Sequence, residues 1–233
     1  MSLEPITIVC GLPRSGTSLM MQILDAAGIR CAGEYPAFEP AELLTGVTSE
    51  FIESNVGGAF KLLDPHLHSL PTGKNYRFIM MTRSRRQQSI SMVKMMRLTQ
   101  SVRPGPISGQ TMEAMRNNIA IEEAEAIGAI SLHGAPILKV RFEDIIERTT
   151  PTVWRIADFL NNWSEPEMAA VVKPRSAVCY NGMLEVELVA EREARDAAEK
   201  LAPFDPLQCQ CHLPPYPCPC TYCEHGEYDR TTV

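Results

Sequence analysis

The segment from Ile6 to Gly28 constrains the fold of this chain more than any other. It begins with a short apolar, mostly β-branched run, Ile6 to Cys10, which leads into Gly-Leu-Pro-Arg-Ser-Gly. Such a run followed by glycine, proline and serine is typical of a buried strand that enters a loop. From Thr17 the pattern predicts a helix that stops at Gly28, because apolar residues recur at helical spacing. These residues are Leu19, Met20, Ile23, Leu24 and Ala27.

Strand and helix patterns alternate along the rest of the chain. Apolar runs that predict parallel strands lie at Ala59–Leu63, Tyr76–Thr82 and Ile137–Val140. Helical spacing lies at Gln87–Leu98, at Thr111–Ile130 and after Pro151, a residue favoured in the first turn. This alternation predicts an α/β protein of three layers, with a central parallel sheet flanked by helices.

Length and charge limit the number of domains and the kinds of partner. A chain of 233 residues, 45% of them hydrophobic, can bury one sizeable core but is short for two full domains. We expect one domain at 1–201, closed by a helix over Val186–Leu201, and a proline- and cysteine-rich tail at 202–233. The net charge of -6 disfavours binding to nucleic acid or to an anionic membrane. No apolar run approaches the ~20 residues of a membrane helix, and Met1–Cys10 lacks a signal core, so we expect a cytoplasmic protein.

The loop between the first strand and helix, Gly11 to Ser18, has the two-glycine spacing of a Walker A motif. It carries Thr17 where that motif requires lysine, which disfavours an ordinary ATPase or GTPase. Backbone N–H groups and the positive end of the following helix can still converge on one phosphate, and Arg14 adds a positive charge. The alternative is ordinary turn chemistry between a strand and a helix.

The string Pro-Arg-Ser-Gly-Thr-Ser, followed by a hydrophobic helix, resembles the 5′-phosphosulfate loop of sulfotransferases. Tyrosine-sulfating and many bacterial members are similar in having arginine in this loop. The resemblance implies a P-loop fold that binds 3′-phosphoadenosine 5′-phosphosulfate (PAPS) and moves its sulfuryl group to a hydroxyl or amine acceptor. The product nucleotide is then adenosine 3′,5′-bisphosphate (PAP). The binding residues that it implies are Pro13, Arg14, Ser15, Gly16, Thr17 and Ser18.

The same resemblance implies a second phosphate site. The family holds the 3′-phosphate with an arginine that ends a strand and a serine eight residues later. Arg83 follows the predicted strand Tyr76–Thr82, and Ser91 is eight residues further on, with Ser89 as a weaker rival. Without the first loop, Arg83 and its basic neighbours would be read as a solvated turn.

Two segments nearer the C-terminus also bear on the resemblance. The strand at Ile137 and its continuation to Leu160 resemble a late strand and helix of the family. The family's third phosphate contact, an Arg-Lys-Gly string, has no match in this sequence. Lys173 and Arg175 are the candidates for its replacement.

Sulfuryl transfer also needs a base for the acceptor's proton and positive charge near the leaving oxygen. Arg14 is the candidate for the charge. The segment Arg30–Glu34 resembles one in tyrosine-sulfating enzymes, which implies Glu34 as the base. Cytosolic members instead end the next strand with Lys-Thr-His, where Lys61 matches the lysine but Leu63 stands at the histidine position. The candidate bases are Glu34, Asp64 and His66, and Lys61 is a candidate for neutralising charge in the transition state. The alternatives are a solvent-facing lysine and surface histidines.

The tail holds five of the eight cysteines of the chain. Clustered thiols in a chain without an export signal favour metal binding over disulfides. We therefore expect a structural zinc site, with a proline-rich tail of exposed thiols as the alternative. The candidate ligands are Cys209, Cys211, Cys218, Cys220 and Cys223.

Two other functions stay open from the sequence. One is a nucleotide kinase-like phosphotransferase with a degenerate loop, and the other is a non-catalytic P-loop scaffold whose tail binds a partner. For the enzyme, we expect a small-molecule or peptide acceptor. No motif identifies that acceptor or the oligomeric state.

Overall fold

The computed structural model describes residues 4–99, 101, 107–162, 164–174 and 176–178. The chain divides into two units, 1–190 and 191–233, and every described residue lies in the first. The predicted boundary near Leu201, the helix over Val186–Leu201 and the five clustered cysteines lie outside the described residues.

The core of the first unit is a parallel sheet of four strands in the order β2-β1-β3-β4. The strands are β1 (Ile6–Gly11), β2 (Ala59–Leu63), β3 (Tyr76–Thr82) and β4 (Ile137–Arg141). Every residue of β1 is buried, as expected for a central strand of a sheet that is covered on both faces. The predicted α/β fold and its four strand positions are confirmed.

Helices cover both faces of this sheet. Four of the five predicted helices are present as α1 (Thr17–Ala26), α3 (Arg85–Leu98), α4 (Gly109–Ser131) and α6 (Thr149–Leu160). Shorter elements that the sequence pattern did not reveal are η1 (Ala41–Thr45), α2 (Ser49–Ser54), η2 (Pro65–Leu67), α5 (Phe142–Glu147) and α7 (Glu165–Ala170). None of the helices in the described ranges combines the length and apolar content that a membrane crossing requires.

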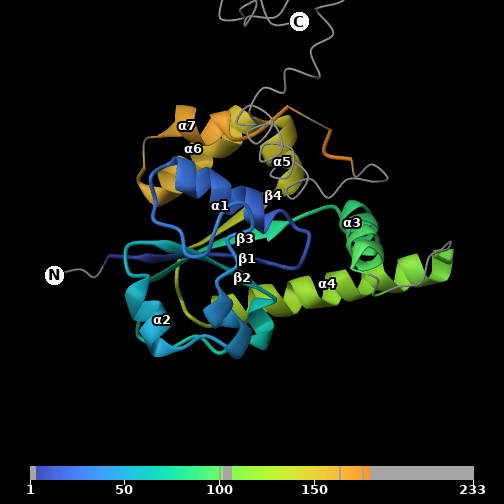
Figure 1. Ribbon diagram of the computed structural model, residues 1–233, viewed down its shortest axis with the longest axis horizontal. Coiled ribbons are helices and arrows are strands. Elements are labelled where there is room, and N and C mark those ends of the chain that lie inside the picture. The colour runs from blue at the N-terminus through green and yellow to red at the C-terminus, as the bar shows by residue number, and fades with distance from the viewer. Residues whose placement is uncertain (1–3, 100, 102–106, 163, 175, 179–233) are drawn as a thin grey trace, which may run out of the picture. The chain divides into compact units, whose positions relative to one another are not determined.

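Alternate residues of each strand pack into two separate apolar cores. Val9, Ile79 and Met81 pack with residues of α1, α5, α6 and α7. Ile8 and Phe78 pack with residues of α2 and α4 on the opposite face. Figure 1 shows this division, with α1 and α5 to α7 above the sheet and α2 and α4 below it.

The order of the strands explains why the faces are shared in this way. The chain leaves β1 in one direction to reach β2, and leaves β3 in the other direction to reach β4. Because crossovers between parallel strands are right-handed, opposite directions place α1 and α4 on opposite faces. A crevice forms at the carboxyl ends of two such neighbouring strands, where open α/β sheets bind their ligands. The loop after β1 and Arg83 after β3 both lie at this position.

Candidate functional site

The loop after β1 is held in shape by its two glycines. A Cβ on Gly11 would lie 2.7 Å from the carbonyl oxygen of Met81, so β3 leaves no room for a side chain there. Gly16 has a φ of 103°, and a Cβ there would lie 2.6 Å from Cδ2 of Phe142. Arg14 between them also has a positive φ, 67°. The loop therefore follows a path that few side chains tolerate at positions 11 and 16.

The N-terminus of α1 is open to an anion. Gly16 is its N-cap residue and has no side chain to bind the first N–H groups, and the first turn of α1 contains no acidic residue. Such N–H groups lack intrahelical acceptors and carry partial positive charge. Ser15 is 1% exposed, and its Oγ has no hydrogen-bond partner among the described residues. These groups together can bind a phosphate or sulfate oxygen.

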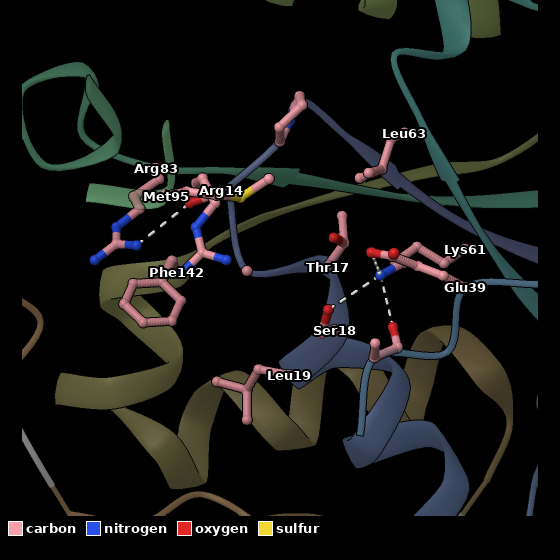
Figure 2. A pocket seen from close by; sticks show the side chains of 13 residues that line it. Arg14, Thr17, Ser18, Leu19, Glu39, Lys61, Leu63, Arg83, Met95 and Phe142 are labelled. Carbon is pink, nitrogen blue, oxygen red and sulfur yellow. Dashed lines mark hydrogen bonds and ion pairs between the residues drawn. The ribbon is translucent and has the colours of Figure 1, made fainter. Parts of the chain in front are cut away.

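Residues far apart in the sequence meet at one pocket beside this loop. Arg14 lines it together with Arg83, Lys61 and Phe142 (Figure 2). The other predicted loop residues that line it are Pro13, Gly16, Thr17 and Ser18, while Ser15 is buried beside them. The structure thus brings the predicted residues of the loop together with Arg83, which follows β3.

Arg14 is hydrogen-bonded to both Arg83 and Ser91. Nη1 of Arg83 donates to the carbonyl oxygen of Arg14 at 3.3 Å, across 69 residues of sequence. Nε of Arg14 donates to Oγ of Ser91 at 3.0 Å. Ser89 instead donates to the carbonyl oxygen of Arg86 within its own helix, so Ser91 is the serine that reaches the loop. The residues predicted for the two phosphate sites are therefore adjacent.

Two further residues support this side of the pocket, and the sequence patterns did not identify them. The guanidinium carbon of Arg83 lies 4.3 Å from the centre of the Phe142 ring, a cation–π distance. Gln88 donates from Nε2 to the carbonyl oxygen of Pro13 at 2.8 Å and ties α3 to the loop. The position of Phe142 directly after a strand is a signal that could have revealed it, since parallel strands end at one edge of the sheet.

Lys61 is buried, so its interpretation as a solvent-facing residue is wrong. The residue is 3% exposed, because strand alternation turns it toward the face that α1 covers. Its Nζ donates to Oγ of Ser18 at 3.1 Å, to the carbonyl oxygen of Ala37 at 2.6 Å and to Oε1 of Glu39 at 2.6 Å. Glu39 also lines the pocket, and Figure 2 shows the pair beside Thr17, across from Arg83 and Phe142.

The predicted base candidates Glu34, Asp64 and His66 do not line this pocket. Glu34 is exposed. Its backbone carbonyl oxygen accepts a hydrogen bond from the Phe38 amide at 2.7 Å. After Leu63 the chain turns at Asp64, whose φ is 48°, so that Nε2 of His66 lies 3.9 Å from Oε2 of Glu125 on α4. Burial raises the pKa of Asp64, although the nearby His66 lowers it in part. None of these three residues lines the pocket, whereas Glu39 does.

The described residues include no metal site. No group of three or more His, Cys, Asp or Glu side chains in this part of the chain could hold an ion. Cys10 and Cys31 are free thiols, and burial raises the pKa of each to about 12. The five predicted zinc ligands, Cys209 to Cys223, lie outside the described residues, as does Arg175; Lys173 is exposed.

Comparisons with known proteins give matches of structure only. No protein-family model and no curated protein matches the chain. A retinol dehydratase solved with androsterone and PAP has a TM-score of 0.48 and 16% identity, over 74% of this chain and 64% of that one. The chain thus spans less than two thirds of that protein.

Two further solved structures are named as sulfotransferases. Mouse SULT7A1, solved with PAP, has a TM-score of 0.49 and 15% identity over 88% of this chain and 87% of its own. STF9 from Mycobacterium avium has a TM-score of 0.49 and 14% identity over 88% of this chain and 78% of its own. Sulfotransferases are thus among the solved structures that this chain resembles.

Proposed function

We propose that this chain is a sulfotransferase that takes a sulfuryl group from PAPS and transfers it to a hydroxyl or amine acceptor. One observation carries the proposal: Arg14 and Arg83 line the same pocket and are joined by a hydrogen bond from Nη1 of Arg83. An ordinary strand-to-helix turn does not require a second arginine from a neighbouring strand. A nucleotide with phosphates on two carbons of its ribose does require a second cation of this kind.

The donor is held by two groups of residues in this proposal. The amides of the loop and of the first turn of α1 bind the 5′-phosphosulfate, and Thr17 and Ser18 add hydroxyl donors. Arg83 and Ser91 bind the 3′-phosphate through charge-assisted hydrogen bonds. Arg14 lies between the two groups, since it contacts Ser91 from within the loop.

The transfer itself is a displacement at sulfur. The acceptor oxygen forms a bond to sulfur while the bond from sulfur to the 5′-phosphate oxygen breaks, and PAP leaves. Negative charge grows on that bridging oxygen, and prearranged cations stabilise it. Arg14 and Lys61 supply positive charge from the loop side and the β2 side of the same pocket.

Glu39 is the proposed base in place of Glu34 and His66. Its carboxylate lies in the pocket, and its bond to Lys61 holds it in position. A carboxylate with this placement can accept the proton that the acceptor hydroxyl loses as the new bond forms. No motif in the sequence marks Glu39, because it belongs to an irregular segment and is recognised only by its contact with Lys61.

Calorimetric titration with PAP tests the function directly. We expect the wild type to bind PAP without magnesium, and Arg14→Ala or Arg83→Ala to weaken binding by about 10-fold to 100-fold, the usual effect of losing a charge-assisted bond. Arg86→Ala is the matched control, since Arg86 is an exposed arginine of α3. No heat with the wild type would favour the scaffold, and turnover that requires magnesium would favour a kinase-like phosphotransferase.

A further inference from the structure

Lys94 on α3 presents a buried positive charge that the proposed mechanism does not use. The residue is 8% exposed. Its Nζ is buried and makes no hydrogen bond with any residue in the described part of the chain. An ammonium group removed from water without a counter-charge is strongly unfavourable. The ammonium group of Lys94 therefore requires an anionic partner, and none of the described side chains provides it.

The helix places Lys94 beside the proposed 3′-phosphate site. Lys94 follows Ser91 by three residues, and residues at this spacing are neighbours on the surface of a helix. Ser91 is buried and contacts Arg14, and Met95, the residue after Lys94, lines the pocket. Lys94 thus lies one helical turn beyond the serine that reaches the loop.

We infer that Lys94 is a further ligand of the nucleotide's 3′-phosphate and makes the site selective for a bisphosphate over a monophosphate. It joins Arg83 and Ser91, and it supplies the positive charge for which this sequence has no Arg-Lys-Gly string. The inference rests on the proposed function. A single ammonium on α3 would then replace a contact that comes from a separate segment in the family.

A comparison of two nucleotides isolates this role. Calorimetry with PAP and with adenosine 5′-monophosphate, which lacks the 3′-phosphate, is carried out on the wild type, Lys94→Met and Lys94→Arg. We expect Lys94→Met to weaken PAP binding by about 10-fold to 100-fold, with monophosphate binding within about two-fold of the wild type. Lys94→Arg keeps the charge and should retain most of the preference for PAP. Lys139→Met removes an exposed lysine and serves as the matched control.

Each outcome has a distinct meaning. A wild type that binds neither nucleotide contradicts the proposed function as well as the role of Lys94. A wild type that prefers PAP, with the same preference in Lys94→Met, overturns the role of Lys94 and leaves the function standing. Thermal unfolding without nucleotide is the second readout. A Lys94→Met protein that unfolds at a lower temperature but keeps its preference for PAP would show that Lys94 has a structural partner instead.

Discussion

The two sides of the pocket are built in different ways. The side that would face the proposed donor consists of the loop from Gly11 to Ser18 and of Arg83, which follows β3, while Ser91 of α3 contacts Arg14 in that loop. The opposite side consists of Lys61 from β2 and Glu39 from the irregular segment that follows α1. The first side depends on backbone groups whose path two glycines determine, and the second depends on side chains that meet through tertiary packing. The difference predicts that a change in the backbone of the loop acts on binding of the proposed donor, and that a change of the Glu39 carboxylate acts on turnover.

The largest expected effect is on turnover, from Glu39→Gln. Because a positioned base contributes about 100-fold to 10,000-fold, kcat should fall by about that factor while the affinity for PAP stays close to the wild type. PAP release is measured with PAPS and a panel of phenol, sterol and tyrosine-peptide acceptors. Glu39→Asp should retain part of the activity. Turnover of Glu39→Gln equal to that of the wild type would remove Glu39 from the mechanism.

A backbone change on the donor side should have the next largest effect. Gly16→Ala places a side chain at a φ of 103° and against the Phe142 ring. We expect a loss of about 1 to 3 kcal/mol in unfolding free energy from the strained conformation, together with weaker PAP binding. Urea unfolding and calorimetry measure the two effects.

Gly128→Ala is the matched control for that change. A Cβ on Gly128, within α4, would meet no atom within 4 Å. Alanine there should stabilise the protein by about 0.5 to 1 kcal/mol, because glycine is unfavourable inside helices. If Gly16→Ala and Gly128→Ala changed the unfolding free energy and the PAP affinity alike, the conformation of the loop would have no special role in the donor side of the pocket.

The smallest effect is expected from Glu34→Gln. This residue is exposed and does not line the pocket, so turnover should stay within about two-fold of the wild type, as for most surface substitutions. The acceptor panel used for Glu39→Gln provides the measurement. A loss of turnover in Glu34→Gln with normal activity in Glu39→Gln would reverse the assignment of the base and restore the residue implied by the family resemblance.

Local patterns in the sequence were sufficient for the strands and the glycine loop, whereas the pairing of Arg83 with Ser91 came from the family resemblance. Apolar runs bounded by glycine and polar residues predict buried strands well, because a parallel sheet covered on both faces needs continuous apolar segments. The positions of Gly11 and Gly16 likewise follow from local conformation and close approach. The donor side was predictable because most of it is built from one continuous loop.

Tertiary structure alone decided the burial of Lys61, its bond to Glu39 and the placement of Phe142 beneath Arg83. Glu39 lies five residues beyond Glu34 in a segment without periodicity, so no local pattern separates the two. Which carboxylate reaches the pocket depends on how that segment packs against β2. The physical reason is that a side-chain pair from distant segments is specified by packing contacts, whereas a loop of backbone amides is specified by the conformations that its own residues allow.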